Sequence, residues 1–80
     1  MLFIFPAEGM WSFHMKDTFL PLDLLFFNER GVLVGFIDGA KPFSEEPLTV
    51  PVPARYVLEI AAGWRKRHQI RIGDQFLDGR

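Results

Sequence analysis

A chain of 80 residues is long enough for one domain, and a domain of this size buries roughly 60% of the surface of its unfolded chain. Nine Phe and two Trp supply large core side chains, and the composition is globular rather than disordered. The absence of Cys excludes disulfides and thiolate metal sites, and the two His have no partner at metal-ligand spacing, so we expect no metal or cofactor. A net charge of −1 provides no general attraction to nucleic acid or anionic lipid.

The first predicted elements are two short strands. Leu2–Phe5 is an apolar run that Pro6 and Gly9 end, and Trp11–Lys16 has aromatic and apolar residues that suit a pleated surface. Thr18–Pro21 then interrupts the pattern. The apolar start is too short for a signal peptide or a membrane span, so we expect no span here.

A hairpin is predicted in the middle of the chain. Leu22–Asn28 is apolar on both faces, as in a strand covered on both sides, and a turn at residues 28–31 leads into Val32–Asp38. Gly35 indicates a bulge, a close approach of another backbone or, as we expect, a bend that closes the sheet. The four Pro residues within 39–53 predict a long surface loop, a kind of segment that often carries function.

The rest of the chain predicts a further strand and a short helix. Arg55–Ile60 alternates as a strand well inside the sheet, and Ala61–His68 fits a helix with a basic last turn, where the helix dipole favours cations. Gln69 stands where glycine is expected after the helix. Ile70–Ile72 and Gln75–Leu77 complete the domain as a last strand pair.

The predicted fold is therefore mainly β (α+β). We expect five to seven short strands in a compact antiparallel sheet curled into a partial barrel, with one short helix and the hairpin Leu22–Asp38 at its centre. A basic cluster near the chain end is interpreted as a solvated face rather than a nucleic-acid site, because no stacking platform or known motif accompanies it. Its residues are Arg65, Lys66, Arg67, His68 and Arg71.

The candidate site lies around residues 12–23, where ionisable and hydroxyl groups stand among apolar runs. The two-residue period of a strand places alternate side chains on a core face and a polar face. These are Trp11, Phe13 and Met15 against Ser12, His14 and Lys16. Side chains two residues apart on a strand are about 6.5–7 Å apart, so the polar stripe alone makes no nucleophile–base pair. His14 with a carboxylate from another strand is the more favourable geometry.

Asp23 lies in the most apolar predicted strand. An unpaired carboxylate there would cost several kcal/mol, so Asp23 should find a partner or take up a proton. The candidate partners are Lys16, Arg55 and the backbone N–H groups of residues 18–21. Two roles remain open for Asp23: an acid/base or ligand-anchoring group, or a cap of this bend.

Three blocks of the sequence together resemble a known family. Ser12–Asp23 resembles the block Ser-Phe-Trp-Met-Lys-Asn-Thr-x-x-Pro-Leu-Asp, and Met1–Phe5 is similar to a strand Gly-Met-Leu-Phe-x-Phe. Ala54–Gly63 is similar to a second hallmark, which leads into Ile70–Asp74. The blocks are those of the DUF192 family, small bacterial and archaeal domains of unassigned function. This chain differs at His14, where the family commonly has Trp, and at Asp17, where it commonly has Asn.

The resemblance also implies a missing portion. Family members usually carry an additional strand and short helix before this point, often behind a signal peptide or lipoprotein anchor. Residues 1–80 are therefore expected to form a single DUF192-like domain that lacks this strand and helix. The compartment, cytoplasmic or periplasmic, stays open. A strand edge left without its neighbour is an association hazard, so we expect a two-fold homodimer that buries Leu2–Phe5 or the neighbouring strand.

Three functions are compatible with these patterns. The first is a binding or accessory module for a small or peptide-like ligand, which the polar stripe, the 39–53 loop and Arg55 would hold. The second is a hydrolase-like enzyme that uses Ser12, His14 and Asp23, and the third is a purely structural interaction module. The candidate ligand-binding residues are expected to converge on one side of the sheet. They are Ser12, His14, Lys16, Asp17, Asp23 and Arg55.

Overall fold

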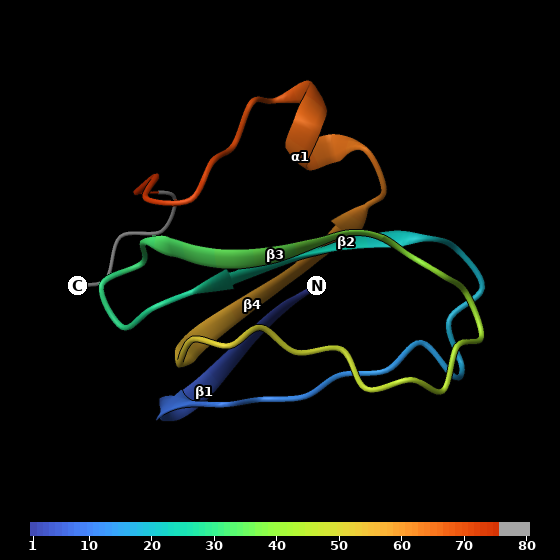
Figure 1. Cartoon of the computed structure of the whole chain (residues 1–80), viewed down its shortest axis with the longest axis horizontal. Coiled ribbons are helices and arrows are strands. Elements are labelled where there is room, and N and C mark those ends of the chain that lie inside the picture. The colour runs from blue at the N-terminus through green and yellow to red at the C-terminus, as the bar shows by residue number, and fades with distance from the viewer. Residues whose placement is uncertain (76–80) are drawn as a thin grey trace.

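Four antiparallel strands form one sheet in the order β1-β4-β2-β3 (Figure 1). This computed structural model describes residues 1–75. The strands are β1 (Leu2–Gly9), β2 (Leu22–Phe27), β3 (Leu33–Ala40) and β4 (Ala54–Ala61), and the helix α1 spans Trp64–Arg67. The prediction of a mainly β fold with one short helix is confirmed. The sheet is not closed into a barrel, and the described residues form fewer strands than expected.

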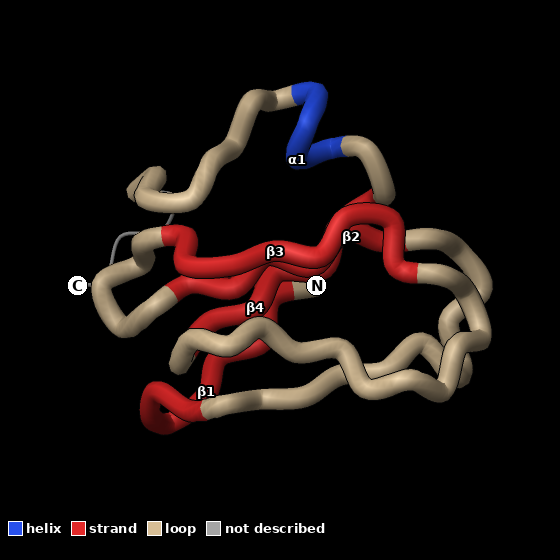
Figure 2. Tube along the Cα trace, in the orientation of Figure 1, coloured by secondary structure: helices blue, strands red, loops and turns tan. Residues whose placement is uncertain are grey.

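Both faces of the sheet are covered, because β2 is apolar on both. Leu24 and Phe26 belong to one core cluster, and Leu25 and Phe27 belong to the other. The loops 10–21 and 41–53 lie side by side over the first face (Figure 2). The helix α1 and the segment that follows it lie over the opposite face (Figure 1). We call these the loop face and the helix face.

The two loops are joined to each other by backbone hydrogen bonds. The Phe13 N–H donates to the Leu48 carbonyl at 2.9 Å, and the Leu48 N–H donates to the Phe13 carbonyl at 2.6 Å. The Met15 N–H donates to the Ser44 carbonyl at 3.0 Å. The prediction of a regular strand at Trp11–Lys16 is wrong, since these residues form only an isolated bridge. The Pro residues of the opposing loop lack the donors that a longer ladder needs. The predicted alternation is confirmed, because Met15 is buried and its neighbours are exposed.

The strand β1 runs further than predicted. It continues through Pro6 to Gly9, which an edge strand tolerates because one side of its backbone has no partner strand. Its register against β4 shifts between Ile4 and Gly9. Arg55 Nε donates to the Phe5 carbonyl at 3.0 Å in this irregular stretch. Arg55 is thus occupied in holding β1 to β4.

The predicted hairpin is correct, but only β2 is central. The strand β3 lies at the second edge of the sheet, so the expectation of a central hairpin is wrong for it. A Cβ added to Gly35 would lie 2.9 Å from the side chain of Val50. Gly35 therefore permits the close approach of the 41–53 loop, and the expected bend for sheet closure is not its role. The strand β4 is interior, as predicted.

The segment after the helix does not form the predicted strand pair. Arg71 and Asp74 close a turn, and Gly73 and Asp74 exchange backbone hydrogen bonds with Leu33, at 2.8 and 2.9 Å. Val32 and Gln75 form an isolated bridge beside them. This segment therefore covers the start of β3. The remainder of the predicted strand, up to Leu77, lies outside the described residues.

The helix is shorter than predicted but has a complete C-terminal cap. Gln69 N–H donates to the Lys66 carbonyl, and Ile70 N–H donates to the Arg65 carbonyl, both at 3.1 Å. These are the two hydrogen bonds of a Schellman motif, which needs a left-handed residue at the position of Gln69. Gln69 adopts this conformation with φ 55°. The absence of glycine at this position therefore lowers stability through the strained backbone of Gln69, but the helix still ends in the Schellman geometry.

The variant Gln69→Gly should raise the free energy of unfolding by about 0.5–1 kcal/mol, because glycine adopts positive φ without a Cβ clash. Urea unfolding of the wild type, Gln69→Gly and Gln69→Ala measures this difference. Alanine retains the clash and should bring no gain. Equal stability of the Gly and Ala variants would contradict this account of the cap.

Candidate functional site

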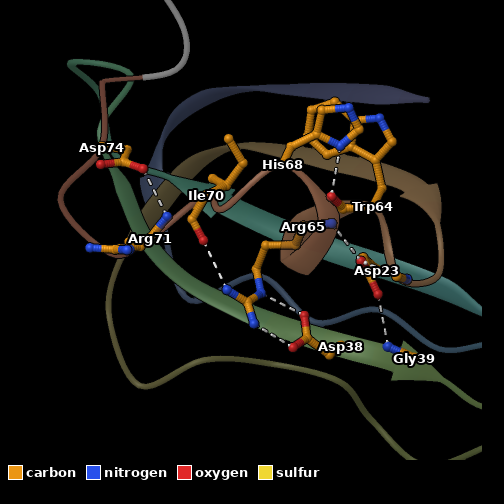
Figure 3. A network of polar contacts seen from close by, with 10 residues as sticks. Asp23, Asp38, Gly39, Trp64, Arg65, His68, Ile70, Arg71 and Asp74 are labelled. Carbon is orange, nitrogen blue, oxygen red and sulfur yellow. Dashed lines mark hydrogen bonds and ion pairs between the residues drawn. The ribbon is translucent and has the colours of Figure 1, made fainter.

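A fully buried carboxylate, Asp23, connects three parts of the helix face (Figure 3). Its Oδ1 accepts the N–H of Gly39 at 2.9 Å. Its Oδ2 accepts the N–H groups of Gly63 and Arg65, both at 3.1 Å. The carboxylate therefore joins β2 to β3 and to the start of α1. Three amide donors compensate for the loss of hydration that burial of a charge entails.

The irregularity of β3 presents one of these donors. The register between β2 and β3 shifts between the pairs Leu22–Ala40 and Leu24–Ile37, opposite Asp23. Gly39 has φ 59°, as in a bulge that places glycine in the left-handed region. The extra residue brings the Gly39 N–H to Asp23 and leaves Asp38 next to the helix. Neither consequence is readable from the alternation of β3 alone.

Arg65 lies beside this carboxylate and binds a different one. Its Nε and Nη2 each donate to Asp38 at 2.7 Å, and its Nη1 donates to the Ile70 carbonyl at 2.8 Å (Figure 3). The guanidinium also lies 3.8 Å from the ring centre of Phe36. The side chains of Arg65 and Asp38 are 13% and 28% exposed. The paired hydrogen bonds from Arg65 lower the pKa of Asp38 below its usual value.

The structure does not bring the six predicted site residues together. Ser12, His14, Lys16 and Asp17 are exposed on the outer side of the loop face, and Asp23 lies on the helix face. The expected convergence is therefore wrong. The reason is parity along β2: Leu24 faces the loops, so the adjacent Asp23 faces the helix. The arrangement that a Ser12, His14 and Asp23 hydrolase requires is not assembled.

Each of these residues has its own local contacts. Lys16 Nζ lies 4.0 Å from a carboxylate oxygen of Glu45, in a solvent-exposed pair of little energetic weight. The Lys16 N–H donates to His14 Nδ1 at 3.4 Å. Asp17 lies in a turn in which the Thr18 N–H donates to the Met15 carbonyl at 3.1 Å. Asp23 bonds to none of its predicted partners, and its cap is at α1 rather than at residues 18–21.

Another carboxylate on the sheet, that of Glu59 on β4, is half-buried. Burial raises the pKa of its carboxyl above the usual value, and the nearby N-terminal ammonium opposes this shift. Asp23, and not Glu59, accepts the amides at the start of the helix. Within residues 1–75, no group of three or more His, Cys, Asp or Glu is arranged to hold a metal ion. No helix in that part of the chain is long and apolar enough to cross a membrane.

Three exposed apolar residues lie where the two loops turn. Phe19, Leu20 and Phe43 are 78%, 70% and 57% exposed, and we call them the aromatic tip. The rings of Phe19 and Phe43 meet edge to face, with centroids 5.3 Å apart. Phe43 N–H donates to the Thr18 carbonyl at 3.2 Å, which fixes one loop against the other. The four Pro residues predicted the 39–53 loop as a segment that often carries function, but the sequence pattern did not point to these three side chains.

The variant Asp23→Ala should lower the free energy of unfolding by about 3 kcal/mol, because three partly buried N–H groups lose their acceptor at once. Urea unfolding measures the loss. Asp74→Ala is the matched control, since Asp74 accepts a single N–H from Arg71. A loss for Asp23→Ala no larger than that of the control would contradict the bridging role.

Removal of the Asp38 charge should matter at neutral pH and not in strong acid. The pKa of Asp38 is lowered on folding, so its contribution is present above about pH 4 and is lost as the pH falls through the folded-state value. Asp38→Asn should cost about 1 kcal/mol at neutral pH, after allowance for partial exposure. Urea unfolding of both proteins across pH checks this. A difference that stays constant into strong acid would contradict the ion pair.

Comparison with known proteins agrees with this fold. The model of the DUF192 family, described as an uncharacterized ACR, matches residues 1–77. A crystal structure from Sinorhizobium meliloti 1021, titled a "putative transcription regulator", has 39% identity and a TM-score of 0.90 over 94% of this chain and 58% of that chain. A protein of unknown function from Novosphingobium aromaticivorans DSM 12444 has 33% identity and a TM-score of 0.89, over 94% and 54%.

No match was found among curated proteins. The chain spans little more than half the length of the two solved relatives. Sequence blocks, the extent of the family match and the shared fold agree, and on these grounds the chain belongs to the DUF192 family.

Proposed function

We propose that this domain is a protein-interaction module and that it docks a partner protein through the aromatic tip. The proposal combines two sequence-based readings, a binding module for a peptide-like ligand and an interaction module. The proposed contact surface is the aromatic tip rather than the polar stripe of Ser12, His14 and Lys16. These three side chains are exposed on the loop face and form no common site with Asp23. Exposed aromatic side chains that fill a pocket of a partner are typical anchors of protein interfaces.

The backbone conformation of Phe43 carries the proposal. Phe43 has φ 62°, and it follows Pro42 in a turn that the Ser44 N–H closes on the Lys41 carbonyl at 3.4 Å. Proline followed by a left-handed residue is the pattern of a type II turn, whose second central position favours Gly or Asn. A bulky residue there costs on the order of 1–3 kcal/mol. More than half of the Phe43 side chain is nevertheless exposed, so burial does not repay this cost.

The surroundings favour a protein partner over a lipid surface. Lys16 stands near the tip but is paired with Glu45, and Asp17 and Glu46 add negative charge to the same loops. Attachment to an anionic membrane requires a surplus of basic residues beside the apolar side chains. A small molecule would require a concave site, whereas these three side chains are exposed. The expected partner surface is therefore an apolar pocket on another protein.

Substitution of Phe43 separates binding from stability. Phe43→Gly should raise the unfolding temperature by a few degrees, because it relieves the left-handed strain, and Phe43→Ala should lower it. Both variants should lose binding. As a probe we choose peptides selected from a displayed random library on the wild-type domain and measured by calorimetry. Their affinity should fall at least about tenfold in both variants.

Ile72→Ser is the matched control, since Ile72 is an exposed apolar residue in the turn after α1. It should retain peptide affinity. Selected peptides that bind Phe43→Gly as tightly as the wild type would overturn the proposal. Vesicles of phosphatidylcholine and phosphatidylglycerol form a second arm. Binding to these vesicles that Phe43→Gly abolishes would identify a lipid surface in place of the protein partner.

A further inference from the structure

Among the described residues, the outer edge of β1 pairs with no other strand, and this edge is separate from the aromatic tip. Its outward-facing groups follow from the pairing with β4. Met1 and Glu59 exchange two backbone hydrogen bonds, at 2.6 and 2.8 Å, so they form a hydrogen-bonded pair of the antiparallel ladder. The next pair, Leu2 with Leu58, and the pair Ile4 with Tyr56 are then non-hydrogen-bonded pairs. The N–H and C=O groups of Leu2 and Ile4 consequently point away from the sheet.

The apolar surface of the sheet continues to this edge. One row across the helix face runs from Leu25 on β2 through Leu58 on β4 to Leu2 on β1. Leu25 is fully buried, Leu58 is half-buried, and Leu2 is 43% exposed. The cover from α1 and Ile70 therefore decreases along the row.

The neighbouring row shows the same gradient. It runs from Phe27 through Tyr56 to Ile4, which is 65% exposed. Both rows thus end in an uncovered aliphatic side chain on β1.

The edge also has little protection against pairing. Between Met1 and Ala7 the sequence holds no charged side chain, whereas exposed edges usually carry charges or bulges. The other edge strand, β3, has two register shifts and is bridged near its start by residues 73–75. On β1 the protection comes from the register shift between Ile4 and Gly9 and from Pro6, which lacks a donor. Pro6 leaves the stretch around Leu2 and Ile4 open.

We infer that a second copy of this chain pairs with this edge, β1 against β1 and antiparallel, about a two-fold axis at Phe3. In this register Leu2 of each copy lies opposite Ile4 of the other. Each such pair exchanges two backbone hydrogen bonds, and the axis makes the pair occur twice. On the helix face Leu2 of one copy meets Ile4 of the other, so both apolar rows continue into the second sheet. The edge is complementary to itself in hydrogen bonding and shape, and no charged side chain lies between Met1 and Ala7 to oppose the pairing.

The short contact predicts a weak, concentration-dependent dimer, since only two residues of each copy supply backbone bonds. Sedimentation equilibrium over a wide concentration range should show the 9.3 kDa chain passing to twice its mass. In hydrogen exchange, the amides of Leu2 and Ile4 should become protected as the concentration rises.

The variant Ile4→Pro tests the edge directly. It removes a donor that points outward and leaves the bonds of β1 to β4 intact, and Phe3 before it already has the extended backbone that precedes proline. We expect a folded monomer. Ile4→Lys adds charge at the same place, retains the backbone N–H, and should raise the dissociation constant at least about tenfold. Ile4→Lys therefore still tests the edge if Ile4→Pro fails to fold.

Ile72→Lys is the matched control and should dimerise as the wild type does, because it places the same charge on an exposed apolar residue away from β1. A wild-type chain that stays monomeric at all concentrations would overturn the inference. A dimer that survives both Ile4 variants would overturn it as well. In that case Phe43→Gly in the same experiment tells whether the aromatic tip holds the copies together, so the two surfaces are tested separately.

Discussion

The burial of one carboxylate determines how the helix face is assembled. Asp23 has no contact with water, and its two oxygens accept backbone N–H groups from β3 and from the start of α1. A buried charge without such donors costs several kcal/mol, a large share of the stability of a small domain. The bulge at Gly39 and the turn at Gly63 must therefore both present their amides toward β2. The fold is closed on this side by hydrogen bonds to a charge as well as by apolar packing.

The ion pair of Arg65 depends on that arrangement. The Asp23 bond to the Arg65 N–H fixes the first turn of the helix, and the bulge brings Asp38 within reach of the guanidinium. Arg65 then covers Phe36 and binds the carbonyl of Ile70, which ties the segment after the helix to the sheet. The basic cluster of the sequence is thus not uniform. One of its arginines is a structural residue, while Lys66 and Arg67 remain exposed.

Sequence reasoning predicted the elements better than it predicted the site. The apolar character of β2 on both faces predicted a strand that is covered twice, and the prolines of 41–53 predicted the loop. That Asp23 would need polar partners was also predictable. Its partners were not, because the donors are main-chain amides 16, 40 and 42 residues away and no side chain marks them. The side of the sheet on which each loop lies is a tertiary fact that short-range periodicity does not contain.

Within residues 1–75, two residues other than glycine have left-handed backbones, and they differ in what the fold gains. Gln69 lies in the cap that ends the helix with two backbone hydrogen bonds, and these bonds offset the strain of its left-handed backbone. Phe43 donates its N–H to the Thr18 carbonyl and lies in the turn that Ser44 closes on Lys41, but its ring remains mostly exposed beside Phe19. Strain that local structure does not repay is characteristic of surfaces used for recognition. This contrast, rather than the polar residues among the apolar runs, directs attention to the loop end.

The central structural claim is that Asp23 is a joint of the fold and that recognition takes place elsewhere. Native-state hydrogen exchange of the amides of Gly39, Gly63 and Arg65 tests it most directly, because all three donate to the same carboxylate. If Asp23 joins the three segments, these amides should open together, with one shared free energy close to that of global unfolding. Three unrelated free energies, with Gly39 exchanging as fast as an exposed loop, would contradict the claim.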